Sequence, residues 1–247
     1  MKKKTLTIAI ALVLVVALAV GATYAYLTAQ TKAVTNTFTA GGAVATNDLT
    51  LKEHVATQNA DGSYTLSDTA YVEEGKGNSY VVLPGVNLPK DPTVTVEKST
   101  GTYYLFVTVE KGSGFMDENA PLSYTTDSAW EQLDIFKEGT TDVTNKELYV
   151  YSVTTDGTTT YIQPKSDTAV SHAILAGIVG DTSNTIKVSD GNAALQLGDN
   201  GSELKFTAYA CQSAGFATPA AAWNGAFAES TGFTAGMPSL PEPPANP

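Results

Sequence analysis

Arginine is absent from this chain of 247 residues, and cysteine occurs once. All 14 basic residues are lysines, set against 25 Asp and Glu, so the net charge is −11. A chain this acidic, without guanidinium groups to clamp phosphates, is repelled by nucleic acid and by anionic lipid surfaces. Cys211 has no second cysteine to pair with, so a packed core must stabilise the fold. Because Cys211 lies in an apolar strand pattern, we expect it to pack as a small hydrophobe.

Histidine is nearly as scarce, since His54 and His172 are the only two. Neither has a second histidine four residues away, as zinc proteases require, and no Gly-x-Ser-x-Gly elbow occurs. We therefore expect no catalytic residues, no metal site, no cofactor and no enzyme activity, and we expect both histidines to be dispensable. Glu53 and His54 are interpreted as an exposed polar pair on a strand. Turn chemistry accounts for the acidic stretches 190–192 and 199–201, which lack the spacing of a calcium loop.

The N-terminus combines three lysines at positions 2–4 with an apolar run from Leu6 to Ala22 and an exit at Thr23-Tyr24-Ala25. A basic start, a short apolar core and a small residue at the end are the parts of a secretory signal peptide. We expect export and cleavage between Ala25 and Tyr26, with the membrane contacted only before that cut. Losing the three lysines leaves 11 against 25 acidic residues, a net charge of −14.

Three segments together resemble the camelysin/TasA family of exported Gram-positive biofilm-fibre subunits, which a dedicated ER-type signal peptidase cleaves. The first is Thr23-Tyr24-Ala25, followed by Asn36-Thr37-Phe38 and Ala40-Gly41; the others are 84–96 and 206–224, with Pro84-Gly85-Val86 and Ala222-Trp223-Asn224. Residues 26–29 depart from the family pattern, because the early acidic residue is missing. The resemblance implies a jelly-roll sandwich, a structural role in extracellular fibres, and strand donation between like or related subunits.

The candidate donor strand spans residues 26–38 and is represented by Tyr26, Leu27, Val34 and Phe38. It contains neither Gly nor Pro, so it can extend as a strand. From the residues alone, an ordinary first strand within the same domain remains an equal alternative.

For residues 39–237 the sequence predicts an all-β domain, because Thr, Val and Tyr are abundant and turn residues are frequent. We expect its strands to form an antiparallel sandwich. Hairpins are expected from 93–97 to the strand at 103–110, across 154–157, and at Asp61-Gly62. A last strand is expected from Glu203 to Gln212. Thr218-Pro219 predicts the start of a short helix over one end of the sheets. Residues 170–179 fit either a strand or a helix.

The tail, residues 238–247, contains five prolines and is expected to be extended. The favoured interpretation is a secreted structural fibre subunit or accessory, located in the matrix or at the cell surface. A cell-surface adhesion or carbohydrate-binding module is the alternative, with Tyr149, Tyr151 and Tyr161 as its candidate sugar-stacking residues. A secreted metalloprotease is the third possibility.

Overall fold

The computed structural model describes residues 43–73, 75–115, 120–137, 145–177, 185–189 and 203–236. All of them belong to one compact unit, residues 41–247. The described part is mostly strand with antiparallel pairing throughout, which confirms the all-β prediction. The signal peptide, the cleavage site at Ala25 and Tyr26, and the donor-strand residues Leu27, Val34 and Phe38 lie outside it, as does the tail from 238.

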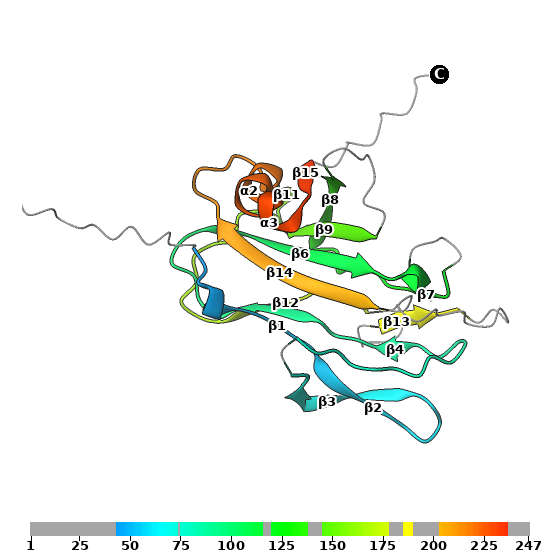
Figure 1. The fold of residues 1–247 in the computed structure, drawn as a ribbon. Helices are drawn as coiled ribbons and strands as arrows, with labels where there is room; N and C mark the ends of the chain where they lie inside the picture. The colour runs from blue at the N-terminus through cyan, green and yellow to red at the C-terminus, as the bar shows by residue number, and fades with distance from the viewer. Residues whose placement is uncertain are drawn as a thin grey trace, which may run out of the picture. The chain divides into compact units, whose positions relative to one another are not determined.

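The largest sheet has five strands in the order β14-β6-β9-β8-β15 (Figure 1). Their bounds are β6 Tyr103–Lys111, β8 Trp130–Phe136, β9 Lys146–Tyr151, β14 Leu204–Gln212 and β15 Thr234–Gly236. A three-stranded sheet, β1-β5-β12, comprises β1 Leu49–Lys52, β5 Thr93–Val96 and β12 Val170–Ala173. Another, β4-β13-β7, comprises β4 Leu88–Pro89, β13 Thr185–Val188 and β7 Leu122–Ser123. The ambiguous 170–179 segment thus begins as a strand.

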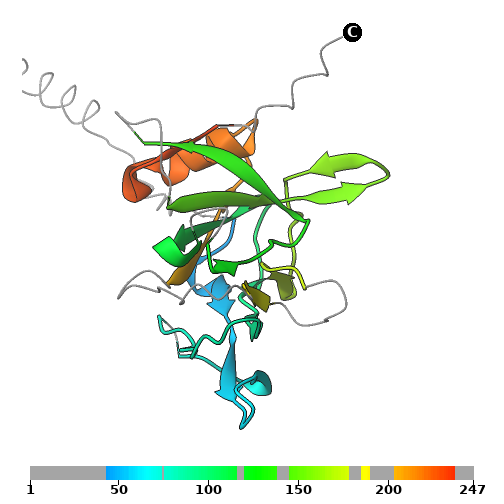
Figure 2. The ribbon, with the colours of Figure 1, turned by 90° about the vertical axis from the view of Figure 1, so that its right-hand side faces the viewer.

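Two hairpins project from these sheets (Figure 2): β2 His54–Gln58 with β3 Tyr64–Tyr71, and β10 Val153–Thr155 with β11 Thr158–Thr160. The second turns at Asp156 and Gly157, which have φ values of 51° and 75°. Positive φ at both central residues suits the right-handed twist of a two-residue hairpin. Both hairpins were predicted from their Asp-Gly pairs, and both are confirmed.

The principal core lies between the five-stranded sheet and the two three-stranded sheets. It is built from alternate residues of the central strands, including Val94 and Val96 of β5 and Leu105, Val107 and Val109 of β6. Because β5 and β6 face each other across this core, the predicted hairpin between them is wrong. Residues 97–102 instead carry the chain from one layer to the other.

A second core covers the opposite face of the five-stranded sheet. Helix α2 (Pro219–Ala226) begins at Thr218, whose Oγ1 accepts a hydrogen bond from the Ala221 backbone N–H at 3.2 Å, and Pro219 occupies the first turn. These features confirm the predicted cap. Trp223 is fully buried against Phe106 of β6, with ring centroids 5.5 Å apart. The helix therefore covers a sheet face, not one end of the sheets as predicted, and β6 is buried on both sides.

Candidate functional site

The candidate site is the side of the sandwich where two edge strands, β1 and β14, approach each other; we call it the β1–β14 seam (Figure 1). Within the described residues, β1 pairs only with β5, and β14 pairs only with β6. Their core-facing side chains are partly exposed: Leu49 and Leu51 from β1, and Leu204, Phe206, Ala208 and Ala210 from β14. Each strand thus presents one backbone edge beside apolar side chains.

The register of β14 shows which backbone groups are directed outward. Gly112 donates its N–H to the Glu203 carbonyl at 2.8 Å, and Ser213 donates to the Thr102 carbonyl at 3.0 Å. Both contacts lie on the ladder that pairs Thr207 with Thr108. Because antiparallel partners alternate between bonded and non-bonded pairs, the even-numbered residues of β14 direct their N–H and C=O groups away from β6. These are the residues whose side chains face the core.

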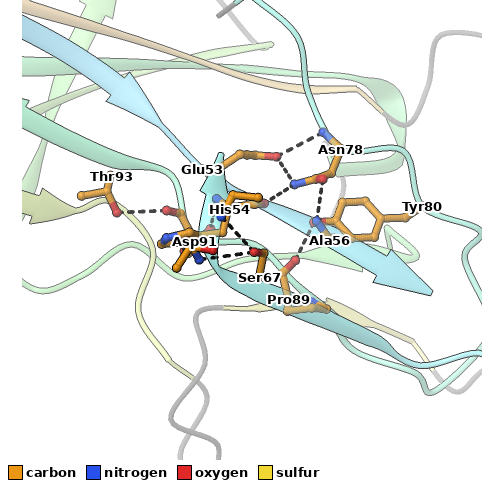
Figure 3. Close-up of polar contacts among 11 residues, drawn as sticks. Glu53, His54, Ala56, Ser67, Asn78, Tyr80, Pro89, Asp91 and Thr93 are labelled. Atoms are coloured by element: carbon orange, nitrogen blue, oxygen red, sulfur yellow. Dashed lines mark hydrogen bonds and ion pairs between the residues drawn. The ribbon is translucent and has the colours of Figure 1, made fainter. Parts of the chain in front are cut away.

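A polar cluster follows directly after β1 and includes Glu53, His54, Asn78 and Asp91 (Figure 3). Lys90 is 8% exposed, and its Nζ lies 2.5 Å from Glu53 Oε2 and 5.8 Å from the centre of the Phe206 ring. Glu53 Oε1 also accepts a hydrogen bond from Asn78 Nδ2 at 2.6 Å. A buried ammonium is tolerated because a carboxylate pairs with it and an aromatic face covers it.

The same cluster holds His54. Its Nδ1 lies 2.6 Å from Asp91 Oδ2, and its backbone N–H donates to Asp91 Oδ1 at 2.9 Å. Asn78 Nδ2 donates to the His54 carbonyl at 2.8 Å (Figure 3). Glu53 and His54 are therefore a half-buried, paired set and not the exposed pair that was predicted. The partners were missed because no local pattern relates residues 53–54 to residues 78 and 90–91. The only signal in the sequence was charge, since the pair Glu53-His54 is complementary to the pair Lys90-Asp91.

His172, the other histidine, is half-buried on β12. Its ring centroid lies 4.0 Å from that of Tyr151, and its Nε2 has no hydrogen-bond partner among the residues that the structure describes. Burial lowers the pKa of His172 below its ordinary value of 6.5. Among the described residues, no three His, Cys, Asp or Glu side chains gather into a group able to hold a metal. The acidic turns at 190–192 and 199–201 fall outside those residues.

Cys211 is 8% exposed in the second core, and burial raises the pKa of its thiol to about 11. This confirms the expected packing role. The three candidate sugar-stacking tyrosines do not form one surface. Tyr149 and Tyr151 pack on the principal core, and Tyr161 packs on the second core on the other side of the sheet.

A half-buried carboxylate, Glu147, bonds to side chains that pack on the principal core. Its Oε1 lies 2.6 Å from Lys111 Nζ, and its Oε2 accepts hydrogen bonds from the hydroxyls of Tyr124 and Tyr149. Burial, reinforced by the Glu147 charge, raises the pKa of both tyrosines well above the ordinary range, so both remain protonated donors. Because Lys111, Tyr124 and Tyr149 all bond to Glu147, we assign this group a structural role.

No helix within the described residues is long and apolar enough to cross a membrane. Comparison with known proteins finds no matching family model, no similar curated protein and no similar solved structure.

Proposed function

We propose that this chain is an exported, non-enzymatic structural subunit or accessory of extracellular biofilm-matrix fibres. In this proposal the signal peptidase cuts between Ala25 and Tyr26, and the freed segment 26–38 of one subunit adds to the β1–β14 seam of the next. The sandwich is then of the jelly-roll type. The proposal rests on the N-terminal pattern, on its resemblance to the camelysin/TasA family, and on the edge of β14 that pairs with no other strand in the described part of the chain.

The edge of β14 is the observation that carries strand addition. An exposed strand edge is a template for a further strand, because its unpaired N–H and C=O groups supply main-chain hydrogen bonds. β14 has nine residues, which span about 30 Å, and segment 26–38 spans about 40 Å when extended. A donated strand would pair along the whole of β14, and its alternate apolar side chains would cover Leu204, Phe206 and Ala208.

Deletion of residues 26–34 from the mature protein tests the donation. We expect a folded monomer that forms no filaments under the electron microscope, whereas the undeleted protein does. If the segment is an ordinary strand of its own domain, the deletion will abolish cooperative unfolding. Normal filaments from the deletion variant would refute donation through this segment.

A proline on β14 gives a sharper test. Ala208→Pro removes an N–H that is directed away from β6, so the β14–β6 ladder keeps its bonds while strand addition at this edge is blocked. We expect a folded protein that fails to polymerise. The matched control, Thr207→Pro, removes a ladder bond and should destabilise the fold. Filament formation by a folded Ala208→Pro variant would show that this edge is not used.

A further inference from the structure

A pocket of about 220 Å³ lies on the face of the five-stranded sheet that carries the helices. Strands β6, β9 and β14 form its floor, and α3 (Ala228–Thr231) with Phe233 forms a wall. Its floor residues on β14 are the odd-numbered ones, so the pocket lies on the opposite face of that strand from the seam's apolar side chains. At this size it is smaller than the roughly 300–1,000 Å³ of pockets for drug-sized ligands, and it fits one small unit.

Two lysines bracket one glutamate in this pocket. Glu110 of β6 lies opposite Lys205 of β14 on one side and Lys146 of β9 on the other. The Lys146 Nζ to Glu110 Oε2 distance is 3.6 Å, whereas Lys205 forms no ion pair with any described residue. The pocket thus carries one positive charge in excess, although the whole chain has a net charge of −11. Such a site attracts a single anionic group.

Hydroxyl groups lie beside the charged residues, two positions along the same strands. Thr207 and Thr108 are directly opposite each other in the ladder, and neither side-chain hydroxyl has a hydrogen-bond partner among the described residues. Thr108 is 9% exposed, and its hydroxyl, which is not fully buried, is open to a ligand in the pocket. Tyr209 also lines the pocket, and its hydroxyl has no hydrogen-bond partner within the described residues.

The wall contributes acceptors. The hydroxyls of Ser230 and Thr231 donate to the Phe227 carbonyl at 3.0 and 2.8 Å, which leaves their oxygen lone pairs as acceptors. The pocket therefore offers donors on its floor, acceptors on its wall and an aromatic ring, Phe233, beside them. A sugar, with several hydroxyls that both donate and accept, matches this set.

From this arrangement we infer that the pocket binds one acidic sugar unit, such as a uronic acid, with its carboxylate held by Lys205, the lysine that Glu110 does not pair with. Thr108, Thr207 and the α3 hydroxyls bind the ring hydroxyls, and Phe233 covers an apolar patch of the ring. A simple anion would use only the lysines, and a divalent cation is repelled by them. The inference is independent of the proposed fibre role, because the pocket lies on the opposite face of β14 from the apolar side chains of the seam.

Titration of the purified protein with D-glucuronate, followed by calorimetry or NMR, tests this inference, with glucose, acetate and inorganic phosphate as comparison probes. We expect glucuronate to bind at least tenfold more tightly than any of the three. Glucose binding as tight as glucuronate would overturn the role of the lysines. Acetate or phosphate binding as tight as glucuronate would reduce the site to a generic anion site and overturn the saccharide assignment, as would the absence of glucuronate binding.

Three variants separate the contribution of the Lys205 charge to glucuronate binding from that of the Thr207 hydroxyl. Lys205→Gln removes the unpaired ammonium and should weaken glucuronate binding about tenfold, the usual size of a lost charge-assisted hydrogen bond. Thr207→Val should weaken glucuronate binding a few-fold without changing that of acetate. Lys187→Gln makes the same charge change at an exposed position on β13 and should leave binding unchanged. Equal affinities for Lys205→Gln and Lys187→Gln, with both folded by circular dichroism, would refute the site.

Discussion

Asp91 is bonded twice to His54: Oδ1 accepts from the backbone N–H at 2.9 Å, and Oδ2 lies 2.6 Å from ring Nδ1. The imidazole ring also stacks on the ring of Tyr71, with ring centroids 4.3 Å apart. Together these contacts fix the start of β2 to the segment between β4 and β5. The hairpin β2–β3 is thereby attached to the body of the sandwich by side-chain contacts at its base.

We expect Asp91→Ala to lower the free energy of unfolding by about 1–3 kcal/mol, because it leaves the His54 N–H without an acceptor in a half-buried place. His54→Gln keeps the backbone bond and should cost less. Urea unfolding measures both, and Asp91→Asn, which retains an acceptor oxygen, is the matched control. Equal stability of Asp91→Ala and the unchanged protein would show that the pair is not a structural anchor.

His172 should make stability depend on pH. Its folded-state pKa lies below 6.5 because burial disfavours the imidazolium, so as pH falls through 6.5 the unfolded chain takes up a proton before the folded protein does. The stability present above pH 6.5 is therefore lost as pH falls toward the folded pKa. His172→Phe keeps the ring contact with Tyr151 and removes this loss.

Unfolding free energies measured from pH 7.5 to 5 should show a shallower decline for His172→Phe than for the unchanged protein. His54→Gln, the other histidine variant, should retain the His172-dependent part of the decline. Parallel curves for His172→Phe and the unchanged protein would contradict the assignment.

Trp223 should be among the most costly residues to truncate. It is fully buried between α2 and the sheet, touches the rings of Phe106 and Phe233, and donates from Nε1 to the Phe233 carbonyl at 3.3 Å. We expect Trp223→Ala to cost about 3–5 kcal/mol in the free energy of unfolding and Trp223→Phe clearly less. A loss below about 1 kcal/mol for Trp223→Ala would mean that α2 does not depend on this contact.

Replacing Ala25 tests the predicted cleavage site. Ala25→Leu places a bulky side chain where the signal peptidase requires a small one, so we expect the uncut precursor to accumulate. Ala29→Leu makes the same change beyond the cut and should be processed normally. N-terminal sequencing and gel mobility of the exported protein distinguish the two, and normal processing of Ala25→Leu would place the cut elsewhere.

Local signals were sufficient where one short stretch determines the geometry. Asp156-Gly157 specified a hairpin turn because both residues tolerate positive φ, and Thr218-Pro219 specified a helix start through a side-chain cap and a missing N–H. The last strand, expected from Glu203 to Gln212, is confirmed as β14, Leu204–Gln212.

Contacts between residues far apart in the sequence could not be predicted in this way. The connection from β5 to β6 has a hairpin's length, yet the two strands belong to different sheets, and Val96 and Leu105 enter the same core from those two sheets. The second face of β6, with Tyr104 and Phe106, packs against Trp223, which lies more than 100 residues further along the chain, so no pattern near β6 indicates this cover. The polar cluster was missed for the same reason, since Glu53 and His54 find their partners more than 20 residues away.

Double burial of β6 has a consequence for hydrogen exchange. This strand has ladder partners on both edges and a core on both faces, so its amides meet solvent only when the whole sandwich opens. The hairpin β10–β11 is exposed along both arms and can open alone. Deuterium uptake by β6 therefore reports the global free energy of unfolding, while uptake by β10–β11 reports only local opening.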